Sequence, residues 1–422
     1  MNGDGDGRFG GRAAAGDDAA VIVRAWSERR DVPLLAPYVL SFVTLESVTA
    51  RLVHVELADG RCGVGECVAL PGYGCESDAD VADAHAAWLP QLAGRTAGEA
   101  RVWLKAVATG AAGAAGATGT AIGATAGGAT ESTSTSTSTS AAGATSGSAD
   151  AATGAAGGGA ERPFALGAAL AALDVATGGI ELPATIDHPL VAAIATEAPA
   201  AMLERVADLH GAGYRTIKVK FGRDAQADAA CVSALLDGLP ADVQLRFDAN
   251  QAYTPEEAAA VLSAFDHPRR DRVELFEQPL GVDEGSWVAF RVLAAGSPVP
   301  LMLDESIETA EDVERAAEYG AAWIKLKQCK GAGVRELLSL AALAKSCGMR
   351  VILGNGVATD VANLFEAGVR AMGGDLFDGA GEECGFARLA TPLLALPPRC
   401  MGGGMRWTGA ARAEAAFALA PA

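Results

Sequence analysis

The sequence predicts an α/β fold in which a parallel barrel follows a smaller α+β unit. From about residue 187 onward, short apolar runs alternate with helical patterns eight times, which favours parallel strands joined by crossover helices and closed into a barrel. Before this point, an alternating strand, a turn and a second strand precede helical patterns, as in an α+β unit. An open doubly wound sheet is the rival fold, but no Gly-rich phosphate loop follows the first run.

The barrel strands are predicted at the eight apolar runs, with helices between them. Thr254 is a favourable N-cap for a helix that begins at Pro255. The runs are residues 190–195, 216–221, 243–248, 273–277, 301–304, 322–327, 351–354 and 375–377. The helices include residues 198–210, 224–236, 255–265, 310–319 and 334–347.

The α+β unit is predicted within residues 19–105. Residues 47–57 alternate polar and apolar side chains like a half-buried strand, and Asp59-Gly60 marks a hairpin turn into residues 62–67. Helical patterns follow at 77–92 and at 163–177. The predicted division is a tail at 1–18, the α+β unit at 19–105, an insert at 106–160, a helical connection at 161–186, the barrel at 187–395, and a segment at 396–422 that packs back on the α+β unit.

The tail and the insert are both expected to be disordered. Residues 106–160 are almost entirely Ala, Gly, Ser and Thr, with Glu131 and Asp150 as their only charged residues. Neither segment can bury enough large apolar surface to offset the entropy lost on ordering.

Charge and composition restrict the partners. The chain has 33 Lys and Arg against 52 Asp and Glu, a net charge of −19, which disfavours nucleic acid and anionic membranes as partners. No window holds the roughly 18 uncharged apolar residues of a membrane span, and the first 30 residues lack the pattern of a signal peptide. The eight scattered cysteines form no CxxC pair and indicate reduced thiols. We therefore expect a cytoplasmic protein.

Charged side chains end five successive predicted strands. They are Lys218 and Lys220, then Asp248, Glu277 and Asp304, then Lys325 and Lys327. Successive positions from Lys220 to Lys327 are 28, 29, 27 and 23 residues apart, about one strand-helix unit each. The strands should therefore deliver these side chains to one rim, where barrel enzymes have their active sites.

The residue types at this rim indicate a metal site with lysine bases. Three converging carboxylates repel one another unless a cation neutralises them, and all-oxygen ligation favours Mg²⁺, with Mn²⁺ as the alternative. A desolvated lysine beside a cation can serve as a general base. One such residue alone is usually a loop contact, but five in register are poorly explained in that way. Within each Lys-x-Lys pair, one lysine can be a supporting or solvated charge.

These segments resemble the enolase superfamily, and within it the muconate-lactonizing-enzyme subgroup. The matching pieces are TIKVK, FDAN, FEQP, LDES, and IKLK before Gly331-Ala332-Gly333. The resemblance covers roughly residues 30–105 and 160–410, and it extends to N-acylamino-acid racemases, o-succinylbenzoate synthases, dipeptide epimerases and muconate cycloisomerases. It implies a modified TIM barrel, (β/α)₇β, with an N-terminal α+β capping domain.

The resemblance also implies roles for the rim residues. Asp248, Glu277 and Asp304 would bind Mg²⁺, which holds the substrate carboxylate and stabilises an enediolate. Lys220 and Lys327 would act as opposed acid and base on the α-carbon. The supporting positions are Lys218, which would depress the pKa of Lys220, Asn250, Glu305 and Lys325, together with capping loops at 36–44 and 66–75 that would select the substrate.

Departures from the family pattern limit the substrate prediction. The seventh run carries no His, which argues against a mandelate-racemase-like branch; Gly354-Asn355-Gly356 stands there instead, so Asn355 is a candidate substrate contact. Dipeptide epimerases hold the substrate ammonium with Asp-x-Asp after the eighth strand. That spacing is absent here, and Asp378, Glu382 or Glu383 are the candidates for a related role. Lys330 is either an anion contact or a surface lysine.

We expect a racemase or epimerase of an amino-acid derivative or dipeptide. The alternatives are an o-succinylbenzoate-type dehydratase, which is a carbon-oxygen lyase, and a muconate-type cycloisomerase. A non-catalytic metal-binding protein is disfavoured because the three carboxylates and both lysines are all present. The expected partner is a small-molecule carboxylate, with no nucleic acid and no membrane, and we expect a homo-oligomer.

Overall fold

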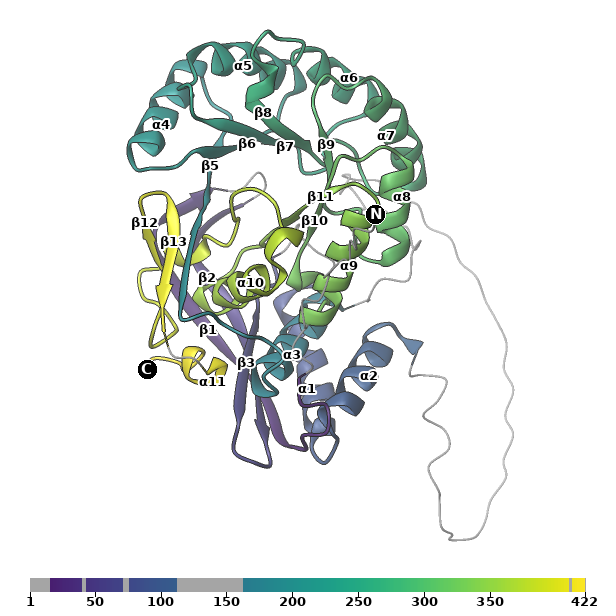
Figure 1. Ribbon diagram of the computed structural model, residues 1–422, viewed down its shortest axis with the longest axis vertical. Coiled ribbons are helices and arrows are strands. Elements are labelled where there is room, and N and C mark those ends of the chain that lie inside the picture. The colour runs from purple at the N-terminus through teal and green to yellow at the C-terminus, as the bar shows by residue number, and fades with distance from the viewer. Residues whose placement is uncertain (1–15, 40–42, 71–75, 112–161, 410–411, 422) are drawn as a thin grey trace, which may run out of the picture.

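The computed structural model describes residues 16–39, 43–70, 76–111, 162–409 and 412–421 (Figure 1). The N-terminal part forms an antiparallel sheet in the order β1-β2-β3, from β1 (Ile22–Val39), β2 (Thr44–Leu57) and β3 (Cys62–Cys67). The predicted hairpin is confirmed: Gly60 occupies the left-handed region at φ +88° between β2 and β3, a conformation that glycine adopts without steric cost.

Helices cover this sheet and complete the capping domain. They are α1 (Asp78–Trp88), the 3₁₀ turn η1 (Leu89–Leu92), α2 (Ala97–Ala108) and α3 (Pro163–Ala176). Ser77 and Thr96 begin α1 and α2 with reciprocal capping boxes. The backbone of α3 approaches β3 so closely that a Cβ atom at Gly65 would lie 2.1 Å from the carbonyl oxygen of Ala168.

The second part is a curled parallel sheet flanked by helices. Its seven strands lie in the order β11-β10-β9-β8-β7-β6-β5. The strands are β5 (Val191–Ala195), β6 (Thr216–Lys220), β7 (Gln244–Asp248), β8 (Val273–Glu277), β9 (Leu301–Leu303), β10 (Trp323–Leu326) and β11 (Arg350–Leu353). The helices are α4 (Pro199–Gly211), α5 (Ala225–Gly238), α6 (Pro255–Ser263), α7 (Glu284–Gly296), α8 (Ala310–Glu318), α9 (Val334–Ser346) and α10 (Asp360–Gly373), with short 3₁₀ turns η3 (Arg270–Arg272) and η4 (Gln328–Lys330).

The predicted eighth barrel strand is wrong. Residues 374–376 form a 3₁₀ turn, η5 (Gly374–Leu376), rather than a strand. The chain immediately after this turn still lies between the two edge strands, because Asp378 N–H donates to Val351 of β11 and Gly381 exchanges backbone hydrogen bonds with Pro189 and Val191 beside β5. Four glycines in this stretch, at 373, 374, 379 and 381, disfavour a regular strand.

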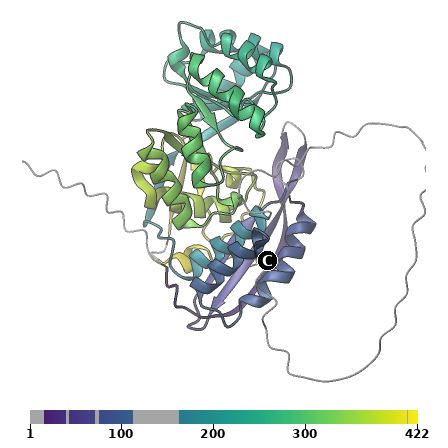
Figure 2. The same ribbon diagram turned by 90° about the vertical axis from the view of Figure 1, so that its right-hand side faces the viewer.

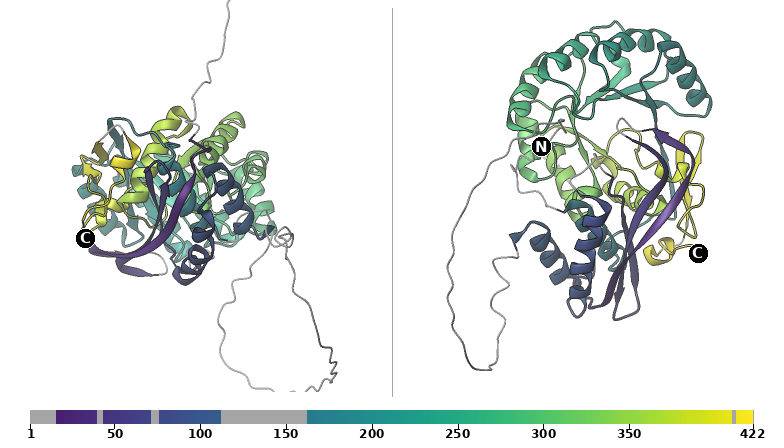
Figure 3. Two further views of the ribbon diagram at one scale, coloured as in Figure 1. Left: turned by 90° about the horizontal axis from the view of Figure 1, so that it is seen from below. Right: turned by 180° about the vertical axis from the view of Figure 1, so that it is seen from behind.

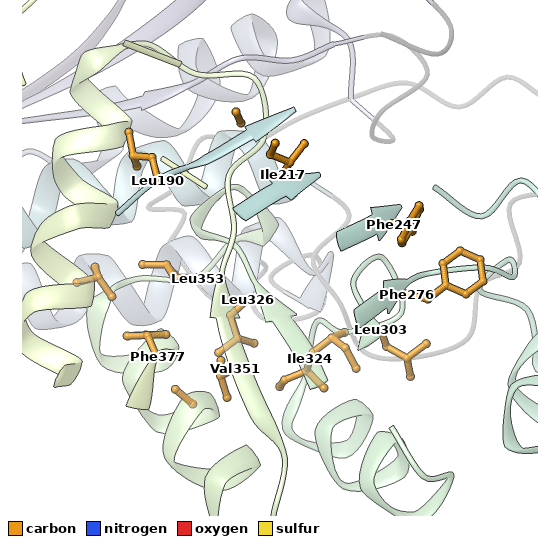
Figure 4. Close-up of a cluster of buried hydrophobic side chains, with 14 of the residues drawn as sticks. Leu190, Ile217, Phe247, Phe276, Leu303, Ile324, Leu326, Val351, Leu353 and Phe377 are labelled. Atoms are coloured by element: carbon orange, nitrogen blue, oxygen red, sulfur yellow. The ribbon is translucent and has the colours of Figure 1, made fainter. Parts of the chain in front are cut away.

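Alternation along the strands separates the two faces of the sheet. Ile217, Phe247 and Phe276 are fully buried on the face that packs against the helices (Figure 4). The residues next to them, such as Lys218 and Arg246, therefore point to the barrel interior, since successive side chains of a strand alternate. Leu275, Met302, Trp323 and Ile352 form a separate apolar cluster. The polar site described below therefore stands over an apolar floor.

A third sheet joins the C-terminal segment to the entry of the barrel. It consists of β4 (Thr185–Pro189), β13 (Gly404–Thr408) and β12 (Arg399–Met401) in the order β12-β13-β4. The 3₁₀ turn η6 (Gly385–Arg388) precedes β12 and β13, and α11 (Ala413–Ala416) contacts α3. Figures 2 and 3 show the capping strands alongside the barrel, with the yellow C-terminal segment next to β1.

The low-complexity insert begins later than predicted. Residues 106–108 belong to α2, and from residue 112 to 161 the insert lies outside the described residues, as does most of the predicted tail. Within the described part of the chain, no helix is long and apolar enough to cross a bilayer. Seven of the cysteines are described, and all seven are free thiols.

Candidate active site

The side chains predicted to meet at the barrel rim do meet. In the sheet, β7, β8 and β9 lie between β6 and β10. The first two strands carry Asp248 and Glu277, and Asp304 follows the third. Lys220 ends β6, and Lys327 follows β10. Asp248, Glu277 and Asp304 are each at most 1% exposed. Parallel strands bring their C-terminal ends to one side of the sheet, so sheet order alone places the three carboxylates between two lysines.

Lys218 and Lys220 hold the β7 side of the cluster. The Lys218 ammonium lies 2.7 Å from Asp248 Oδ2 and 2.8 Å from Glu277 Oε2. Lys220 Nζ donates to Asp248 Oδ2 at 2.7 Å and to Asn250 Oδ1 at 2.9 Å. The more buried Lys218 therefore bridges two carboxylates, while Lys220 stands nearer to solvent.

Lys325 and Lys327 hold the opposite side. Lys325 Nζ donates to Glu277 Oε1 at 2.5 Å and lies 3.8 Å from Asp304 Oδ2. Lys327 Nζ donates to Asp304 Oδ2 at 2.5 Å. Lys330, whose role the sequence left open, is not a free surface lysine: its ammonium lies 3.1 Å from Asp304 Oδ1 and donates to the Ile307 carbonyl at 3.0 Å.

Strained turns after β7 and β8 aim the polar side chains. Asn250 has φ +45° and Gln278 has φ +37°, positive values that few non-glycine residues adopt and that recur at functional sites. The Asn250 turn returns its side chain toward Lys220, and its amide nitrogen donates to Glu305 at 3.3 Å. The buried Gln278 accepts from the Asp304 backbone N–H at 2.8 Å. Gln278 thereby fixes the third carboxylate.

Burial and neighbouring charges shift the carboxyl groups in opposite directions. Burial, and then the charge of Asp248, raises the pKa of Glu277 to about 8. Burial also acts to raise the pKa of Asp248, but Lys218 and Lys220 outweigh it and hold that pKa below its ordinary range. Burial likewise acts to raise the pKa of Asp304, but Lys327 and Lys330 outweigh it and hold that pKa well below its ordinary value.

The donor set suits a hard divalent cation. Glu277 Oε2 and Asp304 Oδ1 are buried and accept no hydrogen bond of normal geometry from the described residues, although each lies beside an ammonium group, of Lys218 and of Lys330. Carboxylate oxygens are the ligands that Mg²⁺ and Mn²⁺ prefer. Among the described residues, no three His, Cys, Asp or Glu side chains are gathered as a ready ligand group. Lys218 and Lys325 lie between the carboxylates, so a metal would have to displace ammonium contacts.

An open cleft leads to the lysines. It has a volume of about 740 Å³, and its walls include Lys220, Asn250 and Glu305 from the barrel and Tyr38 from the capping strand β1. A smaller pocket of about 80 Å³ shares Lys220 and Tyr38 with this cleft and reaches Lys218, Asn355 and Glu382. The capping domain thus contributes to the walls of both cavities.

Of the two remaining predicted substrate contacts, Asn355 lies at the rim and Asp378 lies away from it. Asn355 follows β11 and lines the smaller pocket, with its amide nitrogen donating to Glu366 at 2.6 Å. Asp378 does not join the cluster. Its carboxylate accepts from Lys345 at 2.6 Å and from the Val351 backbone at 2.8 Å, near the start of β11, at the end of the strand away from the rim. The prediction of a substrate contact at Asp378 is therefore corrected to a structural role.

Gln278 and Arg388 were not assigned a role from the sequence, whereas Glu382, a candidate substrate contact there, joins the lysines of the cluster. Glu382 lies 2.9 Å from Lys325 and 3.6 Å from Lys218. Gln278 anchors the Asp304 loop, and Arg388 lines both cavities. Glu382 and Arg388 lie in the irregular chain after α10, where no strand pattern indicates register. Gln278 directly follows Glu277 in the FEQP segment. This position beside a predicted metal ligand is the sequence feature that could have indicated its role.

Comparisons with known proteins match this architecture. The family model described as "Enolase C-terminal domain-like" matches residues 201–375. The L-Ala-D/L-Glu epimerase of Clostridium acetobutylicum is 30% identical over 162 residues, which are 38% of this chain and 44% of that protein. The aromatic dipeptide epimerase of Herpetosiphon aurantiacus is 33% identical over 192 residues, 45% of this chain and 51% of the relative. The chain spans about half the length of the curated relatives it matches.

Solved structures resemble the chain over nearly its whole length. The muconate lactonizing enzyme of Pseudomonas fluorescens has a TM-score of 0.71 at 22% identity, covering 95% of this chain and 97% of the other. The L-Ala-D/L-Glu epimerase of Bacillus subtilis has a TM-score of 0.73 at 18% identity, covering 95% and 100%. At such identities the likeness shows the fold. The predicted capped barrel and the predicted resemblance are both confirmed.

Proposed function

We propose that the chain removes and returns the α-proton of a carboxylate substrate, since residues 201–375 match the enolase C-terminal domain-like model. The observation that carries this proposal is the position of two lysines on either side of three buried carboxylates. Lys220 contacts Asp248 from the β6 side, and Lys327 contacts Asp304 from the β10 side. Two bases that approach from opposite sides suit inversion at one carbon.

The proposed outcome is racemisation or epimerisation of an amino-acid derivative or dipeptide. One lysine accepts the α-proton, and the other donates a proton to the opposite face of the planar anion. Relatives named as epimerases of dipeptides, and the N-succinyl-L-Arg/Lys racemase of Bacillus cereus, at 24% identity over 42% of this chain, support this outcome. A cytoplasmic location and a homo-oligomeric state stay predictions.

Asp248, Glu277 and Asp304 are the residues that would hold Mg²⁺ or Mn²⁺. When bound, such a cation would fix the substrate carboxylate and favour the neutral, proton-accepting form of the neighbouring lysines. Lys218 and Lys325 bridge the carboxylates and limit their repulsion. Asn250 orients Lys220 through its side-chain oxygen.

The test is α-deuteration in D₂O with added Mg²⁺, using N-acylamino acids and dipeptides of defined configuration. Wild-type protein should exchange the α-proton and invert the centre. Lys220→Ala and Lys327→Ala should each lose inversion by at least about 100-fold, since general acid-base catalysis contributes about 10²–10⁴-fold. Each variant should retain some exchange of one stereoisomer, because the other lysine is intact.

Lys105→Ala is the matched control, because Lys105 lies on α2 of the capping domain and pairs with Glu336 at the surface. It should leave exchange and inversion unchanged. Full exchange in both Lys220→Ala and Lys327→Ala would show that the two-base assignment is wrong. Wild-type exchange that proceeds equally well without a divalent ion would remove the metal from the proposal.

A further inference from the structure

Arg388 lines the cleft together with Lys220, one of the two proposed bases. It ends η6, and its guanidinium lies 4.2 Å from the centre of the Tyr38 ring on β1. The backbone here is joined to β1, because Ala390 N–H donates to the Pro33 carbonyl at 2.8 Å and Leu34 forms a β-bridge with Leu389. Figure 3 shows β1 beside this C-terminal part of the chain. The guanidinium plane is thus supported by an aromatic face.

Arg388 has no acidic partner among the described residues. Its recorded polar contact is to Cys384 Sγ at 3.5 Å. Two acids near it in sequence are engaged elsewhere: Glu382 pairs with the site lysines, and Glu383 pairs with Arg370 at 2.9 Å and His188 at 2.8 Å. The 740 Å³ cleft is also lined by Glu197, Glu204, Asp208 and Glu305. Arg246, fully buried in the barrel, differs in that it lies 2.7 Å from Glu274.

This absence of a counter-ion has a physical cost. A guanidinium is always charged in proteins, and a charge removed from bulk water is unfavourable unless an anion or hydrogen bonds compensate it. Arg388 is only partly exposed, and it lines both the 740 Å³ cleft and the 80 Å³ pocket. Lys220 lines the same two cavities. The compensating anion can therefore come from a molecule bound in the cleft.

We propose that Arg388 binds a second anionic group of the substrate, so that the preferred substrate is a dianion with one carboxylate at the Asp248–Glu277–Asp304 cluster and another at Arg388. This inference rests on the proposed function and names its substrate class. The planar guanidinium suits bidentate recognition of a carboxylate. The second carboxylate can belong to an acidic side chain or to a dicarboxylic N-acyl group, and the chemistry at Arg388 is the same.

Two matched substrate pairs test the proposal. L-Ala-L-Glu and L-Ala-L-Gln differ by one charge on the side chain, and N-succinyl-L-alanine and N-succinamoyl-L-alanine differ by one charge on the acyl group. Wild-type protein should show a KM about 10- to 100-fold lower for the dianion of one pair, the range expected for a hydrogen bond to a charged group. The pair that shows the KM difference identifies whether Arg388 binds a carboxylate of the side chain or of the acyl group.

Arg388→Met should raise the KM of the preferred dianion to that of its neutral partner and leave the neutral partner unchanged. Arg388→Lys should restore part of the difference, because it keeps the charge but not the planar fork. Arg399→Met, on the exposed strand β12, is the control and should change neither KM. Melting temperatures establish that the variants are folded.

The outcomes separate this inference from the proposed function. A wild-type KM ratio near one in both pairs overturns the role of Arg388, whether or not Arg388→Met folds. An equal effect of Arg388→Met on both members of a pair also overturns it, although the two-lysine reaction then stands. Calorimetric titration measures the binding of the same pairs even if no reaction occurs. Tighter binding of the dianion that depends on Arg388, without any α-deuteration, would support the anion site and refute the reaction.

Discussion

Replacing Glu66 with alanine is expected to loosen the capping domain from the barrel. Glu66 lies on β3, is 1% exposed, and reaches across to the start of α10. Its carboxylate accepts from Thr359 N–H at 2.7 Å, from Thr359 Oγ1 at 2.6 Å and from Ala362 N–H at 2.9 Å. The first N–H groups of a helix have no partner within the helix, so a residue of the capping domain satisfies the N-terminus of a barrel helix.

The size of the effect follows from the donors left behind. Glu66→Ala leaves two buried backbone N–H groups without acceptors, and each costs roughly 1–3 kcal/mol. The Thr359 hydroxyl can turn to another acceptor, so we count only the backbone groups and expect a loss of about 2–6 kcal/mol. Urea unfolding measures this loss. Glu56→Ala, at the surface of β2 beside Arg24, is the control and should cost at most about 0.5 kcal/mol.

Glu66 also predicts a pH dependence of stability. Burial raises the pKa of Glu66 from near 4.5 to about 7, although hydrogen bonds from Thr359 and Ala362 favour the anion. The folded state therefore binds the proton more tightly than the unfolded state. The resulting stabilisation is fully present below about pH 4.5 and is lost as pH rises through 7. At 1.36 kcal/mol per pH unit it amounts to at most about 3 kcal/mol.

Glu66→Gln lacks this titration and supplies the comparison. The stability of the wild type relative to Glu66→Gln should fall between about pH 4.5 and pH 7, the window set by the raised pKa of Glu66. Parallel pH profiles for the two proteins would refute the assigned pKa shift. A loss below 1 kcal/mol for Glu66→Ala would refute the account of the helix N-terminus.

Three further results are expected. Gly65→Ala should cost about 3 kcal/mol or more in urea unfolding, because the new Cβ atom would meet the backbone of α3 at 2.1 Å; an unchanged midpoint would contradict the close approach. Asp304→Asn should weaken Mg²⁺ or Mn²⁺ binding in a calorimetric titration, whereas Asp378→Asn, away from the rim, should leave metal affinity unchanged. Deleting residues 112–161 should preserve both the melting temperature and metal binding, and loss of folding would show that the predicted disordered insert has a structural role.

Much of this protein could be predicted from local patterns in its sequence. Hydrophobic alternation located β2, β3 and all seven strands of the parallel sheet, because strand burial leaves a period of two or a continuous apolar run. The regular spacing of Asp248, Glu277 and Asp304 placed them at one rim, because each strand-helix unit returns the chain to the same end of the sheet. These features depend on residues near in sequence and on a repeated geometry.

The tertiary structure decided what depends on distant contacts. The chain after η5 takes the place of an eighth strand without strand geometry, because its glycines weaken regular pairing and a few bonds to β11 and β5 suffice. Asp378 looked like a site residue by sequence position, yet it binds Lys345 at the other end of the strand. Arg388 and Tyr38 are 350 residues apart, and only the docking of β1 on the C-terminal segment brings them to the same cleft. No local pattern records such a pairing, since it is fixed by the packing of the two domains.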